Sequence, residues 1–241
     1  MPRIWEALRR AEDEQAGETV EAPVATGQRR SKGRSVREKL LAVYQGIESS
    51  LPDKRSRVIA FVGANPGEGT STLVREFGRL VSRELAKRVV LLDVEPGLGG
   101  HYEQFGVEFE DGLDAVVSGR RQLEDVLQPV HGDTLFLGCL AASGTSASSV
   151  AASARFTELV DELRQGFDLV LFDTPPVRNS STALLILPQS DGVVMVVEAG
   201  KTRWQVADSL RQRVESQGNS IVGVILNKRK YYIPWSIYRR L

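Results

Sequence analysis

The sequence predicts an α/β fold in which a doubly wound, mostly parallel sheet is flanked by helices. Apolar segments of strand length alternate along the chain with helical patterns, which is typical of parallel strands joined by crossover helices. Residues 193–197 (VVMVV) are apolar at every position, and this indicates a strand that is buried on both faces. The chain has 241 residues, of which 41% are hydrophobic, so it can bury the core that such a sheet requires.

The elements are expected in the following order. Residues 2–14 form a short amphipathic helix, and residues 15–35 form a linker because they are rich in Gly, Pro and polar residues without periodicity. The α/β domain then covers 36–227 and begins with a helix at 36–50. Apolar, β-branched runs predict strands at 57–62, 88–93, 134–138, 168–173, 192–198 and 220–226. Helical periodicity predicts helices at 71–86, 112–117, 121–128, 150–165, 180–187 and 203–217.

The composition argues against several classes of protein. Lys and Arg number 31, as do Asp and Glu, so no overall charge indicates nucleic-acid binding. The single cysteine, Cys139, excludes an internal disulfide framework and fits a reducing cytoplasm. No apolar run approaches the ~20 residues of a membrane span. We therefore expect a cytoplasmic protein, and any peripheral contact with the inner face of the membrane would come through a partner or a surface.

A glycine-rich turn follows the first predicted strand and leads into a helix. Its residues are Gly63-Ala64-Asn65-Pro66-Gly67-Glu68-Gly69-Thr70-Ser71-Thr72. Successive backbone N–H groups and a helix N-terminus would face phosphates there, and Ser71 would offer a hydroxyl to Mg²⁺. The P-loop pattern G-x-x-x-x-G-K-[ST] requires Lys before the hydroxyl residue, but this chain has Thr70, and Ala64 stands in place of the first Gly. The turn therefore predicts a nucleotide site that lacks its principal cation.

Polar residues also end three further predicted strands. These residues are Asp93 with Glu95 two positions later, Asp173, and Asn227. The carboxyl ends of the strands in a doubly wound sheet form the edge at which ligands bind. Carboxylates at that edge suit Mg²⁺, and the amide of Asn227 could contact a base. An aspartate at the end of one strand is more often a helix cap or a turn former. Several polar strand ends that follow the glycine-rich turn in order predict one nucleotide site.

Taken together, these motifs resemble the cytoplasmic domain of the bacterial tyrosine kinases (BY-kinases) of capsule and exopolysaccharide systems, which are related to MinD/ParA-type P-loop ATPases. The resemblance covers about residues 36–241, and the opening residues 3–8 (RIWEAL) also resemble exopolysaccharide-cluster members. It rests on 66–72 (PGEGTST), the strand ending at Asp93, 112–114 (GLD), 123–126 (LEDV), 167–176 (FDLVLFDTPP), 199–202 (AGKT) and 223–228 (GVILNK).

The resemblance implies that the chain binds ATP or ADP with Mg²⁺. Asp93 would be the catalytic carboxylate near the attacking hydroxyl, Glu95 would stand beside it, and Asp173 would orient the water shell of the metal. The implied metal ligands are Ser71, Asp93 and Asp173. Nucleotide contacts are expected from Gly67, Glu68, Gly69, Thr70, Ser71 and Thr72, and from Asn227, which would contact adenine.

The chain departs from the family pattern in ways that point to weakened chemistry. Thr70 replaces the phosphate-binding Lys, and Glu95 replaces the usual second Asp of its strand. The Glu-x-x-Arg-x-x-Arg oligomerisation helix reads Glu38-x-x-Leu41-x-x-Tyr44, and the tyrosine-rich tail is reduced to Tyr231, Tyr232 and Tyr238. Lys201 follows the predicted strand at 192–198 and is a candidate replacement cation. This role is disfavoured because Lys201 resembles a residue that is common in the family.

The leading hypothesis is an exopolysaccharide or capsule biosynthesis and export protein that resembles a tyrosine kinase, binds ATP·Mg²⁺ and transfers phosphoryl groups poorly. It would act beside a membrane-embedded chain-length or export protein, with self-association left open and no nucleic-acid partner. One alternative is a catalytically inactive pseudokinase scaffold. A partition-type positioning ATPase is less favoured, because Gly67-Glu68-Gly69 and Thr174-Pro175-Pro176 look more kinase-like.

Two further features are weighed against plainer interpretations. His101 and His131 lie in different predicted loops with no second ligand nearby in the sequence, so solvent or core histidines are favoured over a metal site. The tail at 228–241 interleaves cations with aromatic residues. A phosphoacceptor tail, a membrane-surface contact, a docking segment and a tail packed on its own domain all remain open.

Overall fold

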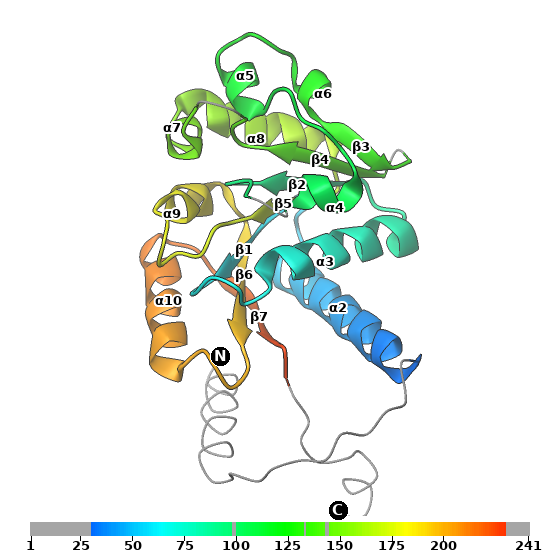
Figure 1. The fold of residues 1–241 in the computed structure, drawn as a ribbon, viewed down its shortest axis with the longest axis vertical. Helices are drawn as coiled ribbons and strands as arrows, with labels where there is room; N and C mark the ends of the chain where they lie inside the picture. The colour runs from blue at the N-terminus through cyan, green and yellow to red at the C-terminus, as the bar shows by residue number, and fades with distance from the viewer. Residues whose placement is uncertain (1–29, 98–99, 133, 143–144, 230–241) are drawn as a thin grey trace, which may run out of the picture.

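The computed structural model describes residues 30–97, 100–132, 134–142 and 145–229 (Figure 1). The strands are β1 (Arg57–Gly63), β2 (Val89–Asp93), β3 (Gln128–His131), β4 (Leu135–Cys139), β5 (Leu169–Asp173), β6 (Gly192–Glu198) and β7 (Ile221–Asn227). They form one seven-stranded sheet in the order β3-β4-β2-β5-β1-β6-β7. Only the β3–β4 pair is antiparallel. This arrangement confirms the predicted α/β fold with a mostly parallel sheet.

Helices cover both faces of the sheet (Figure 1). They are α2 (Arg30–Ser50), α3 (Thr70–Leu85), α4 (His101–Phe105), α5 (Leu113–Val117), α6 (Leu123–Val126), α7 (Ala147–Ala151), α8 (Ala154–Gly166), α9 (Thr182–Ile186) and α10 (Trp204–Ser216), with a 3₁₀ turn at Leu187–Gln189. No helix in the described ranges is both long and apolar enough to cross a membrane.

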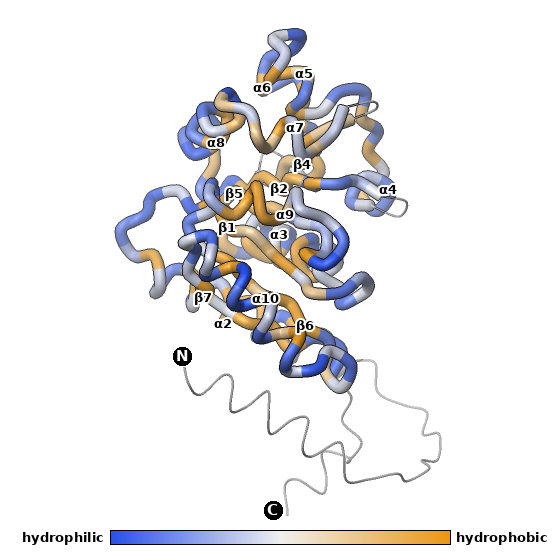
Figure 2. Tube along the Cα trace, turned by 90° about the vertical axis from the view of Figure 1, so that its left-hand side faces the viewer, coloured by the Kyte–Doolittle hydropathy of each residue, from blue (hydrophilic) through white to orange (hydrophobic). Residues whose placement is uncertain are grey.

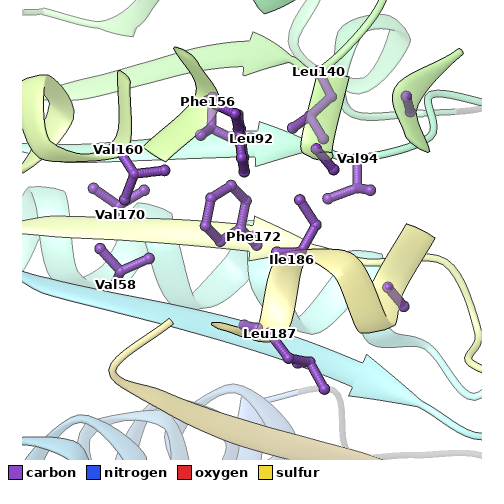
Figure 3. Packing of buried hydrophobic residues seen from close by; sticks show 14 of the residues in the cluster. Val58, Leu92, Val94, Leu140, Phe156, Val160, Val170, Phe172, Ile186 and Leu187 are labelled. Atoms are coloured by element: carbon purple, nitrogen blue, oxygen red, sulfur yellow. The ribbon is translucent and has the colours of Figure 1, made fainter. Parts of the chain in front are cut away.

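Each central strand contributes to two cores, because successive side chains point to opposite faces. On β1, Val58 and Ala60 face the core under α8, α9 and α10, whereas Ile59 and Phe61 face the core under α2 and α3. Figure 3 shows part of the first core, where Phe172 of β5 lies among side chains from β2, α8 and α9. Figure 2 shows the hydrophobic residues gathered along the central strands. The fully apolar strand patterns thus follow from burial on both faces.

Helix α2 packs on α3 through the register that the resemblance assigns to an oligomerisation helix. Tyr44 is buried in the chain's own domain, with its ring centroid 6.4 Å from that of Phe77, and Leu41 packs on the same core. Arg37 donates to Glu84 of α3 at 2.7 Å. These two residues therefore pack within the chain's own domain.

The predicted element boundaries were wrong in several places. Helix α2 begins at Arg30, so the end of the predicted linker is helical. The helix expected at 150–165 is divided into α7 and α8, and the hydroxyl of Ser153 caps α8 by accepting from the Phe156 N–H at 3.2 Å. Strand β3 and helix α4 were not predicted. The predicted helix at 2–14, most of the linker and the tail from 230 onward lie outside the described residues.

Candidate nucleotide-binding site

A cavity of about 500 Å³ lies at the carboxyl ends of β1, β2 and β5. Its lining residues are 65–72, Asp93, Glu95, Gly97, Gly100 and 173–176. Nine of the ten predicted site residues line this cavity, and Asn227 is the exception. The structure thus brings the P-loop and the strand-end carboxylates together, as a doubly wound sheet requires. The roles given to these residues stay predictions.

The glycine-rich turn adopts the backbone conformation that a phosphate loop needs. Gly67 and Gly69 have φ values of 82° and 91°, in the left-handed region that favours glycine. A Cβ on Gly69 would also clash with Nδ2 of Asn227, so a larger residue would force Asn227 to shift. Helix α3 starts directly afterwards at Thr70, and the N–H groups of its first turn have no partner within the helix. These donors, together with the helix dipole, form a site for an anion.

The carboxylate of Glu68 supports the loop from within. Glu68 is 2% exposed, and its Oε2 accepts hydrogen bonds from the backbone N–H groups of Ala64 at 2.7 Å and Asn65 at 3.1 Å. Its Oε1 accepts from the Thr202 hydroxyl at 2.5 Å and from Nδ2 of Asn65 at 3.2 Å. The side chain is thus used inside the loop, and Glu68 offers a ligand its backbone.

Residues at the end of β7 hold the loop from the other side. Asn227 donates from Nδ2 to the carbonyl oxygen of Glu68 at 2.8 Å. Lys228 donates from Nζ to the carbonyl oxygen of Gly67 and lies 3.2 Å from Glu198. The side chain of Lys201 is 70% exposed and pairs with Glu198 at 3.5 Å, outside the cavity lining. Sequence reasoning did not identify Lys228, which contacts the loop, although its place directly after Asn227 was the available signal.

Two aspartates stand side by side at the floor of the cavity. Asp93 of β2 and Asp173 of β5 are register partners on adjacent strands, and both are buried. Glu95 is exposed and accepts a hydrogen bond from the Ser180 hydroxyl at 2.6 Å, which places it at the rim. The spacing of Asp93 and Glu95 therefore separates a buried carboxylate from an exposed one.

A histidine that sequence reasoning set aside completes this floor. His101 is fully buried, and its Nε2 lies 2.7 Å from Oδ2 of Asp173. Ligand atoms of Asp93, His101 and Asp173 all lie within 4.8 Å of one another. His101 and Asp173 are 72 residues apart, so no local sequence pattern signals the contact.

The environment of Asp93 favours its protonated form. Burial raises the pKa of Asp93 to about 7, with His101 opposing the shift and the negative charge of Asp173 adding to it. A carboxyl group that titrates near neutral pH is suited to accept a proton from a substrate hydroxyl. This property agrees with the catalytic role that the resemblance gives to Asp93.

The residues at the floor fit a hydrated divalent cation. Oδ1 of Asp173 is buried and has no hydrogen-bond partner among the described residues, so it is available as a ligand. Ser71 lines the same cavity and supplies a hydroxyl oxygen. Mg²⁺ takes oxygen ligands of this kind and keeps several waters. Ser71, Asp93 and Asp173 would therefore hold Mg²⁺ beside a nucleotide whose phosphates lie on the loop.

The comparison with known sequences finds similarity to bacterial tyrosine kinases. No family model matches the chain. Tyrosine-protein kinase YwqD of Bacillus subtilis is 26% identical over 196 residues, which cover 80% of this chain and 81% of YwqD. Tyrosine-protein kinase ptk of Acinetobacter johnsonii is 27% identical over 191 residues, which cover 79% of this chain but only 26% of ptk. The chain is thus similar to bacterial tyrosine kinases over about four fifths of its length.

Solved structures of known proteins show a similar fold. The kinase domain of the Escherichia coli tyrosine kinase ETK has a TM-score of 0.73 and 21% identity, covering 82% of this chain and 78% of that one. The septum site-determining protein MinD from Pyrococcus horikoshii, complexed with Mg-ADP, has a TM-score of 0.60 and 18% identity, covering 77% and 76%. The chain therefore has the fold of these proteins, with Thr70 in place of the loop lysine.

Proposed function

We propose that this chain binds a Mg²⁺–nucleotide at the glycine-rich loop and acts in exopolysaccharide or capsule biosynthesis and export as a tyrosine-kinase-like protein with impaired phosphoryl transfer. The observation that carries the proposal is a complete loop backbone, supported by Glu68, Asn227 and Lys228, that lies opposite Asp93 and Asp173. It would work at the inner face of the membrane, beside a membrane-embedded chain-length or export protein.

The chain's own residues have distinct tasks in this proposal. The amides of the loop and of the first turn of α3 bind the phosphates, while Ser71 and Asp173 position the cation, which supplies charge stabilisation when bound. Asp93 accepts the proton of the attacking tyrosine hydroxyl, because its pKa lies near neutrality. Phosphoryl transfer depends on positioning and charge stabilisation, so loss of one donor slows it by about 10²–10³.

A pseudokinase scaffold is the second candidate, and one observation favours it. Among the described residues that line the cavity, none is Lys or Arg. The developing charge on a transferred phosphoryl group would therefore meet no side-chain cation from the described cavity lining. Under this alternative the chain keeps the fold and regulates a membrane-embedded export partner without chemistry.

Isothermal titration of the full chain with Mg·ATP and Mg·ADP tests the proposal, together with the variant Thr70→Lys. A charged hydrogen bond contributes about 1.5–3 kcal/mol, so the Lys should tighten nucleotide binding by about 10–150-fold. Thr70→Met is the matched control, since it lengthens the side chain without a charge and should not tighten nucleotide binding. If neither the native chain nor the Thr70→Lys variant binds nucleotide, the result supports the pseudokinase scaffold.

Detection of phosphotyrosine then separates an impaired kinase from an active one. We expect the native chain to phosphorylate itself or a tyrosine peptide far more slowly than the ~1–100 s⁻¹ of typical kinases. Turnover in that range by the native chain would contradict the claim of impairment and leave the nucleotide site intact.

A further inference from the structure

We propose that Asp93, His101 and Asp173 form a site for a transition-metal dication of the Zn²⁺ or Co²⁺ class, which binds without nucleotide. The inference deepens the proposed function, because Asp93 and Asp173 belong to the proposed Mg²⁺–nucleotide site, and it adds His101 as the residue that decides which metal is preferred. His101 begins the short helix α4, whereas the two aspartates end β2 and β5.

The geometry of the three side chains is close to that of a metal centre. One ligand atom from each lies within 4.8 Å of the other two, and all three residues are buried. Zn²⁺ binds nitrogen and oxygen ligands at about 2.0–2.2 Å, so neighbouring ligand atoms of a tetrahedral site lie about 3.3–3.6 Å apart. The observed separation between His101 Nε2 and Asp173 Oδ2 is 2.7 Å. A metal ion could therefore replace the shared proton once these two side chains move apart by less than about 1 Å.

The buried negative charges at the floor of the cavity also favour a bound cation. Neither Asp93 nor Asp173 forms an ion pair with a Lys or Arg of the described residues, and the sole ion-pair partner of Asp173 there is His101. Burial of carboxylates without a compensating charge is costly. A dication bound by both carboxylates would remove that cost.

Two polar atoms are left without partners at the same place. Oδ1 of Asp173 and Nδ1 of His101 are buried and make no hydrogen bond within the described structure. The side chain of Asp173 is 5% exposed and lines the cavity, so its free oxygen is a ready ligand. The imidazole tautomer that carries its proton on Nδ1 leaves the Nε2 lone pair for a metal.

The imidazole determines the expected order of affinities. Mg²⁺ prefers oxygen ligands and water, whereas Zn²⁺ and Co²⁺ accept imidazole readily. A site with two carboxylates and one imidazole should therefore bind Zn²⁺ and Co²⁺ more tightly than Mg²⁺. Without the imidazole, the two carboxylates offer only oxygen ligands, and the difference in affinity between Mg²⁺ and Zn²⁺ or Co²⁺ should become smaller.

The experiment titrates the full chain with ZnCl₂, CoCl₂ and MgCl₂ in chelator-free buffer without nucleotide. We expect one Zn²⁺ or Co²⁺ per chain, bound more tightly than Mg²⁺, and visible absorption bands from bound Co²⁺. Loss of a group that merely orients a ligand costs about 10–100-fold in metal affinity, so His101→Gln should cost more than about 100-fold for Zn²⁺. The affinity for Mg²⁺ should change little.

The chain's other histidine provides the matched control. His131→Gln should leave the metal affinities unchanged, since the chain contains only these two histidines. If His101→Gln does not fold, the two imidazole resonances of the native chain can be followed by NMR during the Zn²⁺ titration. The imidazole resonance of His101 should then shift in proportion to the bound metal, and the resonance of His131 should keep its chemical shift.

Three results would overturn the inference: no saturable Zn²⁺ or Co²⁺ binding, binding that His101→Gln leaves intact, or an imidazole signal of His101 that metal does not move. Each would mean that the His101–Asp173 contact is a structural hydrogen bond only. Failure of the proposed function gives a different result, namely metal binding at the three residues with no binding of Mg·ATP.

Discussion

Replacing Glu68 with Gln tests whether the buried carboxylate supports the phosphate loop. The native carboxylate accepts hydrogen bonds from Ala64 N, Asn65 N, Asn65 Nδ2 and the Thr202 hydroxyl, at distances from 2.5 to 3.2 Å. Gln keeps the shape and one acceptor oxygen. Its NH₂ group, however, faces groups that are donors in the native loop, and the negative charge is lost.

The expected cost follows from these contacts. The two backbone N–H bonds become neutral, which about halves their strength, and the bond from Nδ2 of Asn65 is lost. The Thr202 hydroxyl can turn and accept from the new NH₂ group, so that contact survives in weaker form. The sum is a loss of about 2–3 kcal/mol in the free energy of unfolding. For a chain of 241 residues, this corresponds to a fall of about 4–12 °C in Tm.

Urea unfolding and thermal melts followed by circular dichroism measure this loss. Glu95→Gln is the matched control, because Glu95 lines the same cavity but is exposed and contacts Ser180 alone through the hydroxyl at 2.6 Å. The control should lie within about 0.5 kcal/mol of the native chain. If Glu68→Gln also falls within that range, the carboxylate gives no net stabilisation and the loop does not depend on it.

Three further predictions concern stability, the loop and assembly. Asp191→Asn should cost about 3 kcal/mol by breaking the pair with Arg164, whose Nη1 lies 2.6 Å away. Burial raises the pKa of Asp191, but the hydrogen bonds from Arg164, the Val58 N–H and Lys54, with the charge of Arg164, together outweigh burial and lower the net pKa. The stabilisation is therefore present above the unfolded pKa of about 4 and lost as the pH falls through the folded pKa, so urea midpoints of variant and native chain should converge in acid. Gly69→Ala should cost about 1–3 kcal/mol because φ is 91° and the new Cβ meets Asn227, and calorimetry should show weaker nucleotide binding. Because Tyr44 is buried in its own domain, light scattering should find a monomer or small oligomer, and a stable octamer would contradict this.

The sequence was sufficient where a structural feature depends on local pattern. The central strands were predicted within about two residues because continuous apolar runs reflect burial on both faces. The positions of Asp93 and Asp173 at one edge followed from the rule that parallel strands end together. By contrast, β3 was missed because it is a short antiparallel edge strand that contains Pro129 and has no apolar alternation. The division between α7 and α8 was missed because Ser153 fits the helical pattern as well as it fits a cap.

The contacts that complete the site depend on distance in space and could not be read along the chain. His101 meets Asp173 across 72 residues, and Lys228 meets Gly67 across 161. The second contact bears on the missing P-loop lysine. In a peptide the C=O and N–H groups point in opposite directions, and Lys228 binds the carbonyl side of the loop, whereas phosphates would bind the amide side. Its ammonium group therefore stabilises the loop and does not replace the charge that Thr70 lacks, so an intact phosphate-binding backbone is compatible with impaired transfer.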